Sequence, residues 1–481
     1  MNSAESLAES PAESLDTPAS SHDSGRRLAR AWILMAVAAL LASGLFVLLI
    51  IASRAPVVGE LFPLQNFFHL AIVVHVDFSV LVWFGAIAAA LWSLNTRPGM
   101  LRTGWLALGL VMAGSVLLAI APFHPGEAIM SNYVPVLDNG WFTAGLLVFA
   151  AGLVIAALRQ MLIPLPVDLN DPARAVARFG IQSAAIIIIL SAGALLWSWL
   201  AIPDFLSGSS YYEVLFWGGG HILQFAWVQL MLVAWLCLAS AAGVRIALRP
   251  KWLLLLLLAN FVPAFLGVWG YLQFDVGSPA HRSFFVWLMA AGGGLAAGPI
   301  GLGLLHAAWR RGRGYEAPGS AGALAGPLQA GLVWSVVLFG VGGMLGFFIE
   351  AGNTIVPAHY HGCIVAITLA FMMLTLHLAP RLGLGRAGPR ITRAVAWTYG
   401  TGQLLHIAGL AWSGGHGVQR KTAGAAQGLE GLAQMAGMSA MALGGLIAII
   451  GGVLFLIAFG KALLQRRPAI DGALAKGGLG T

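Results

Sequence analysis

The sequence predicts an all-α integral membrane protein, built as a single bundle of about twelve transmembrane helices. Hydrophobic residues make up 59% of the 481 residues and charged residues only 9%, a composition typical of polytopic membrane proteins. The apolar residues also gather into segments of about 20 or more, the length that crosses a bilayer. Because lipid offers the backbone no hydrogen bonds, we expect these segments to be helices packed in one bundle.

The expected spans follow one another from residue 30 to residue 464. Short polar or Gly- and Pro-rich stretches separate them, such as the flexible connection GRGYEAPGSAGALAGP at 312–327. We place the spans at 30–53, 67–94, 102–122, 140–162, 178–203, 211–246, 251–274, 282–308, 328–351, 355–380, 390–413 and 434–464.

The two ends of the chain differ from the apolar centre. Residues 1–28 are rich in Ser, Ala, Glu and Asp, which predicts a disordered cytoplasmic tail. Residues 29–465 form the predicted helical membrane domain, and residues 466–481 form a short basic cytoplasmic tail. No basic n-region with a short apolar core precedes the first span, so we expect that span to direct insertion itself.

The positions of Lys and Arg predict the orientation of the bundle. The net charge of +8 alone could suggest a nucleic-acid partner. With the N-terminus inside, however, 22 of the 26 Lys and Arg fall in cytoplasmic segments. This is the positive-inside bias of membrane proteins, so we expect a lipid bilayer and no nucleic acid. The predicted location is a bacterial inner membrane with both termini cytoplasmic. The outer exceptions are Arg54, Arg282, Arg420 and Lys421.

Four histidines share one depth in this topology. The second, sixth and tenth spans run from outside to inside and carry His75, His221, and the pair His359 and His361. Each lies roughly seven to eleven residues from the outer end, which is about 10–15 Å at 1.5 Å per residue. Ionisable residues inside spans are rare and usually functional. The shared depth therefore predicts a metal or haem site, because haem iron takes axial imidazole and bundle cores hold such cofactors.

The tenth-span pair lies in the motif VPAHYHG. Successive helical residues turn by about 100°, so His359 and His361 point to opposite sides of their helix. Histidines meant for one ion usually stand three or four residues apart. The pair therefore suits two different cofactors, one on each face; the alternative is two histidines that hydrogen-bond between helices.

Two further features accompany these histidines. Gly218 to Gly220 precede His221, and small residues there leave room for a flat ligand or a neighbouring helix. The basic pair Arg420 and Lys421, in GVQRK, could meet haem propionates at the outer surface. The alternative for that pair is a solvated loop.

Together these motifs resemble the catalytic subunit of the haem-copper oxidases, the superfamily of cytochrome c oxidase subunit I and the nitric oxide reductase large subunit. The resemblance covers about residues 30–465, and VPAHYHG is its most specific motif. It implies that His75 and His361 ligate a low-spin haem from opposite faces. It also implies that His359 is the proximal ligand of a high-spin haem.

The same resemblance implies that His221 is a copper ligand, but the rest of the copper site departs from the family. Where the family has a His-His pair on the seventh span, this chain has Tyr271 and Leu272. Leucine cannot ligate, and a tyrosine phenolate suits ferric iron better than cuprous copper. His281 is expected to fall in the outer loop. We therefore expect two haems and less than one copper, with His221 and Tyr271 as catalytic side chains or His221 in a weak non-copper site.

Three functions remain open at this point. The first is electron transfer to a high-spin haem that reduces O₂ or NO. The second is a haem-based gas or redox sensor, or a haem-handling protein. The third is a transporter. For the first, the chain has no C-x-x-C-H haem motif, so electrons must come from a cytochrome c-type subunit or a quinol. A small accessory membrane subunit is a further expected partner.

Overall fold

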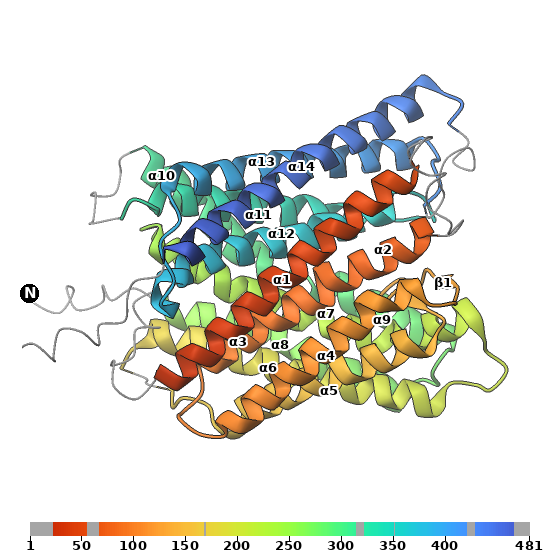
Figure 1. Cartoon of the computed structure of the whole chain (residues 1–481), viewed down its shortest axis with the longest axis horizontal. Helices are drawn as coiled ribbons and strands as arrows, with labels where there is room; N and C mark the ends of the chain where they lie inside the picture. The colour runs from red at the N-terminus through yellow and green to blue at the C-terminus, as the bar shows by residue number, and fades with distance from the viewer. Residues whose placement is uncertain are drawn as a thin grey trace, which may run out of the picture.

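The chain folds into a bundle of long helices that lie side by side along one axis (Figure 1). The computed structural model describes residues 23–54, 67–167, 170–313, 322–350, 352–420 and 429–465, with backbone alone at 50–54 and 67–68. The helices are α1 (Asp23–Arg54), α2 (Phe67–Asp77), η3 (Phe78–Val82), α3 (Trp83–Leu94), α4 (Leu101–Ile120), η4 (Ala121–Phe123), α5 (Gly140–Leu162), α6 (Pro172–Ala201), α7 (Gly208–Ala241), α8 (Pro250–Gln273), α9 (Pro279–Gly292), α10 (Ala297–Gly312), α11 (Ala325–Gly346), α12 (Ile355–Leu378), η5 (Ala379–Leu382), α13 (Pro389–Gly415) and α14 (Leu432–Leu464).

The predicted all-α membrane bundle is confirmed. Within the described ranges, eleven helical segments are long and apolar enough to cross a membrane. The twelfth predicted span is α13, a helix of 27 residues whose polar side chains lower its apolar content. The second span is α2 and α3 joined by the π-helical turn η3, and the eighth is divided into α9 and α10 after Gly292.

Two helices form the centre of the bundle. In their most apolar stretches, 89% of the α7 residues and 83% of the α12 residues are buried, against 33% for α1 and for α14. A helix that is apolar on all sides is expected in such a central position. The central helices are the ones that carry His221, His359 and His361. His221 is buried, and His359 and His361 are half-buried.

The first helix begins earlier than predicted. It starts at Asp23, within the stretch assigned to a disordered tail, whose residues 1–22 lie outside the described chain together with 466–481. The additional helical residues pack against other helices: Leu28 and Ala29 are fully buried. A Cβ on Gly104 of α4 would lie only 2.4 Å from the Leu28 side chain. This contact extends the helix beyond its purely apolar run.

A small hairpin lies at the end of the bundle that the charge distribution predicts to be the outer one. Strand β1 (Ala128–Ile129) pairs antiparallel with β2 (Val136–Leu137), with Ala128 opposite Leu137 (Figure 1). The hairpin contacts both α2 and α7. Its loop thus lies over the helices that carry His75 and His221.

Candidate functional site

The three predicted haem ligands are held in the same way. The Nδ1 atom of His75 lies 3.1 Å from the Ser43 carbonyl oxygen, that of His359 lies 2.8 Å from the Gly342 carbonyl, and that of His361 lies 3.1 Å from the Pro357 carbonyl. A carbonyl can only accept, so Nδ1 must carry the proton in each ring. In a neutral imidazole this leaves the lone pair on Nε2 free to bind a metal.

His75 has a second anchor on α1. The Ser43 hydroxyl lies 2.8 Å from His75 Nδ1 and also donates to the His75 backbone carbonyl at 3.1 Å. Ser43 is itself buried. Hydrogen bonds of this kind orient the ring of a metal-binding histidine.

The position of His359 depends on a close contact between α11 and α12. A Cβ on Gly362 would lie 2.4 Å from Gly342 Cα, so only glycines allow the two backbones to come this near. The contact brings the Gly342 carbonyl to His359. Gly346, one turn further along α11, gives room for the imidazole, since a Cβ there would lie 2.8 Å from the His359 ring.

A further histidine, His406 of α13, lies against His361. The two ring centroids are 4.9 Å apart. His406 Nδ1 lies 2.9 Å from the Met441 carbonyl of α14, so it too has a free Nε2. His406 lies within the predicted span 390–413, and sequence reasoning assigned it no role. Its position in the middle of a predicted span was the available signal.

His221 of α7 differs from these four histidines. It is only 3% exposed, and its Nδ1 lies 2.6 Å from the Trp217 carbonyl. Its Nε2 also has a protein partner, the Tyr133 hydroxyl at 2.8 Å. Because Nδ1 holds the proton, the Tyr133 hydroxyl must donate to Nε2. Sequence reasoning missed Tyr133 as a site residue, because no spacing rule connects a loop residue to a helix far along the chain.

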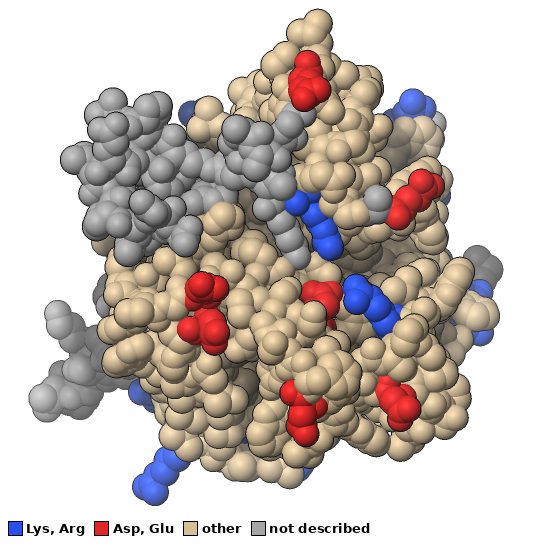
Figure 2. All heavy atoms as spheres, turned by 90° about the vertical axis from the view of Figure 1, so that its right-hand side faces the viewer, with Lys and Arg blue, Asp and Glu red and all other residues tan. Residues whose placement is uncertain are grey.

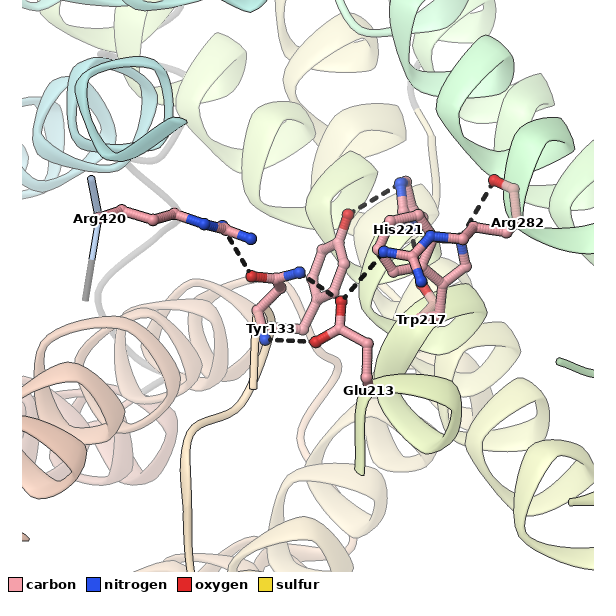
Figure 3. Close-up of polar contacts among 7 residues, drawn as sticks. Tyr133, Glu213, Trp217, His221, Arg282 and Arg420 are labelled. Carbon is pink, nitrogen blue, oxygen red and sulfur yellow. Dashed lines mark hydrogen bonds and ion pairs between the residues drawn. The ribbon is translucent and has the colours of Figure 1, made fainter. Parts of the chain in front are cut away.

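Polar contacts hold the Tyr133 loop on the end of α7 (Figure 3). The Glu213 carboxylate accepts from the Asn132 backbone N–H at 3.0 Å and also from the Asn132 side-chain amide. Arg282 of α9 lies 3.8 Å from Glu213 and stacks over the Trp217 ring at 4.4 Å. Glu213, Trp217 and His221 follow one another at intervals of four residues and therefore share one face of α7.

Arg420 joins the same network. Its guanidinium donates to the Asn132 side-chain oxygen at 2.9 Å, so the predicted propionate-binding residue sits beside the Tyr133 loop. Lys421 lies outside the described residues. On the end of the molecule that carries this loop, basic side chains lie near the centre, among acidic ones (Figure 2).

Tyr271 and Leu272 stand where the oxidase family has its copper-binding His-His pair, and their side chains point in different directions. Tyr271 is 5% exposed, and its hydroxyl lies 2.8 Å from the Ser198 hydroxyl. Leu272 is 64% exposed on the lipid side of the bundle. His281 was predicted in the outer loop, but it lies in α9 and is buried, because Ser278 caps that helix and starts it earlier than expected. Its ring packs against Tyr271 at 4.9 Å.

The glycine triplet does not provide open space for a haem. A Cβ on Gly218 would lie 2.2 Å from the Tyr271 hydroxyl. One on Gly220 would lie 2.5 Å from the Tyr133 ring. Gly219 faces Leu195 and Ser191 of α6. The expectation that these glycines make room for a neighbour is therefore correct only for protein side chains and a helix.

The residues of α2 and α12 fit haem, and those around His221 do not fit copper. The rings of His75, His359 and His361 are half-buried, with Nε2 atoms that make no hydrogen bond to described residues. His221 has no such atom to offer. In the described ranges, no three His, Cys, Asp or Glu residues gather into a metal-binding group. A haem needs only axial imidazoles, so the lack of such a group among the described residues does not bear on haem binding.

Comparisons with known proteins support the fold. No family model matches the sequence. An uncharacterized protein of Rickettsia prowazekii (strain Madrid E) is 27% identical over 495 residues, covering 91% of this chain and 96% of the relative. An uncharacterized protein of Aquifex aeolicus (strain VF5) is 28% identical over 358 residues, covering 73% of this chain and 84% of the relative. Among solved structures, a heme-copper terminal oxidase, determined as a dimer by cryo-EM, matches with a TM-score of 0.70 and 14% identity. That match covers 92% of this chain and 85% of the oxidase chain, and it establishes an oxidase-like membrane fold.

Proposed function

We propose that this integral membrane protein is an oxidoreductase that binds two haems and reduces a small diatomic molecule, O₂ or NO. His75 and His361 would hold the low-spin haem, and His359 the high-spin haem. The observation that carries this proposal is the shared geometry of the three rings, each with Nδ1 on a backbone carbonyl and Nε2 free. The oxidase-like fold adds support.

Haem, when bound, supplies the electron transfer and the ligand reduction that a polypeptide cannot perform. The side chains of this chain orient and tune it. Ser43 and the three carbonyls fix the imidazole rings, and such anchors raise the basicity of a ligating histidine. Arg420 lies where it could pair with a propionate. Electrons would come from a cytochrome c-type subunit or a quinol, in an inner membrane with both termini cytoplasmic.

A second candidate function is a haem-based gas or redox sensor, or a haem-handling protein. The observation that favours it is His221, whose two ring nitrogens are both engaged by protein groups. A haem without a second metal beside it has fewer redox centres for a multi-electron reduction. Haem content alone does not separate the two functions, whereas steady-state turnover with a reduced donor does.

The test is the haem and metal content of the purified protein. Pyridine haemochrome, iron, copper and zinc should give about two haems and clearly less than one copper per chain. His75→Ala should lose one haem. His416→Ala is the matched control, because His416 has the same Nδ1-to-carbonyl contact, 2.8 Å to Trp412, but is exposed at the end of α13. Protein that binds no haem, or His75→Ala protein with unchanged haem, would contradict the proposal.

A further inference from the structure

We propose that Tyr133 is a built-in partner of His221 that keeps a second metal ion out of this site. The phenol occupies the only ring nitrogen of His221 that could bind a metal. This inference goes beyond the proposed function, because it rests on the hairpin loop, α7 and α9 and holds for an oxidase and a sensor alike.

The hydrogen-bond directions carry the first step. The Trp217 carbonyl accepts a hydrogen bond from His221 Nδ1–H at 2.6 Å. The lone pair on Nε2 then faces the Tyr133 hydroxyl at 2.8 Å. A metal ion needs that same lone pair. Binding therefore requires the half-buried phenol to move away and give up its hydrogen bond to His221.

The packing shows that the phenol has a fixed place. Gly220 leaves space for the ring, since a Cβ would lie 2.5 Å from Tyr133 Cγ and Cδ1. The ring meets Trp217 edge to face, with centroids 5.8 Å apart. Any larger residue at Gly220 would push the loop away from α7. Helix α7 therefore provides both the space for the Tyr133 ring and the His221 nitrogen that accepts its hydrogen bond.

The loop is anchored independently of Tyr133. Asn132 donates two hydrogen bonds to the Glu213 carboxylate. Arg282 forms an ion pair with the same carboxylate. Arg420 donates a hydrogen bond to the Asn132 side chain. Charge-assisted hydrogen bonds of this kind are stronger than neutral ones. The anchors hold the residue next to Tyr133, so the phenol stays on His221 without depending on its own hydrogen bond alone.

A second imidazole packs against the same aromatic ring as His221. His281 and His221 both pack against Phe285, with ring centroids at 5.0 and 5.5 Å. His281 Nε2 is buried and has no hydrogen-bond partner among the described residues. Imidazole nitrogens suit copper and zinc. Without the phenol, this region would hold two imidazoles with free nitrogens.

The experiment measures metal uptake by the purified full chain, with any affinity tag removed. Wild type, His221→Ala, Tyr133→Ala and the double variant Tyr133→Ala/His221→Ala are exposed to Cu(I) or Zn²⁺, desalted, and assayed for metal. We expect equal content in wild type and His221→Ala. Tyr133→Ala should gain about one ion per chain, which the double variant loses. Tyr133→Phe, which keeps the ring packing but frees Nε2, should also exceed the wild type and covers the case in which Tyr133→Ala does not fold.

Two results would overturn the inference. One is stoichiometric metal in the wild type that disappears in His221→Ala. The other is folded Tyr133 variants that take up no more metal than the wild type. Tyr212→Phe, which removes a hydroxyl from the outer end of α7 away from His221, should leave uptake unchanged. Haem content is recorded in parallel, so that a failure of the proposed function is seen separately from a failure of this inference.

Discussion

The histidines of α2 and α12 and the histidine of α7 make the same kind of hydrogen bond at Nδ1 but differ at Nε2. In both regions a backbone carbonyl accepts a hydrogen bond from Nδ1–H. On α2 and α12 the Nε2 lone pair then has no protein partner, whereas on α7 it accepts from Tyr133. The half-buried rings of the first region contrast with a His221 that is 3% exposed.

The difference shows that a histidine in a predicted ligand position need not be available to a metal. The Nδ1 contact sets the tautomer, but the surroundings of Nε2 decide between ligand and hydrogen-bond acceptor. The close approach of α11 and α12 at Gly342 and Gly362 prepares His359. The space at Gly220 prepares the Tyr133 contact. Glycines thus allow both contacts. One leaves Nε2 of His359 free, and the other brings the Tyr133 hydroxyl to Nε2 of His221.

The largest expected effect is the separate loss of each haem from the first region. His361→Ala should remove the low-spin spectrum and leave high-spin haem, and His359→Ala should do the reverse, because the two side chains leave α12 on opposite faces. Optical and EPR spectra of the purified variants measure this. If either substitution removed both signals in a folded protein, the two-haem interpretation would lose its main support.

The sequence could predict the features that depend on one segment, but not the contacts between segments that are far apart in the chain. Apolar length and positive-inside charge predict the bundle, because each depends on one segment at a time. The opposite faces of His359 and His361 follow from helix periodicity alone. The Tyr133 contact does not, since Tyr133 and His221 are 88 residues apart. The burial of His281 depended on the start of one helix, which sequence patterns place poorly because a capping serine such as Ser278 is a common residue in loops as well.

The second prediction tests whether His406 belongs to the proposed haem site of α2 and α12. Its ring contacts His361, so it should act on the low-spin haem as a neighbour of the ligand rather than as the ligand. His406→Ala should keep both haem signals but weaken retention of the low-spin haem about 10- to 100-fold, the range for outer-shell partners of metal ligands. Haem transfer to apomyoglobin measures the retention. Complete loss of the low-spin spectrum would instead make His406 a ligand, and no change would remove it from the site.

The third prediction concerns the anchor that distinguishes the His221 region. Glu213→Ala removes the acceptor of two Asn132 hydrogen bonds and the partner of Arg282. Hydrogen bonds to charged groups contribute about 1.5–3 kcal/mol each, so thermal unfolding should show a clear loss of stability. Glu213→Gln keeps one carbonyl oxygen and should lose less. Equal stability of Glu213→Ala and wild type would mean that the loop is held by packing alone.

The smallest expected effect is a pH dependence that belongs to the His221 region only. Burial raises the pKa of Tyr133 well above its ordinary value, and the nearby Glu213 carboxylate acts in the same direction, while Arg282 opposes it. In the unfolded chain the phenol loses its proton as the pH rises through about 10, whereas in the folded chain it keeps the proton and its bond to His221. The unfolded state then binds fewer protons than the folded state, so this group makes stability fall as the pH rises above about 10.

Tyr133→Phe isolates that effect, because it removes the titrating group and keeps the ring. At neutral pH the variant should be less stable by about 0.5–1.5 kcal/mol, the net value of one hydrogen bond. As the pH is raised past about 10, the wild type should lose that advantage, since only its unfolded state gains from ionising at this position. Thermal unfolding of both proteins on either side of that pH measures the difference. A constant gap between the two would mean that the Tyr133 phenol ionises equally in both states, and that the contact with His221 does not shield it.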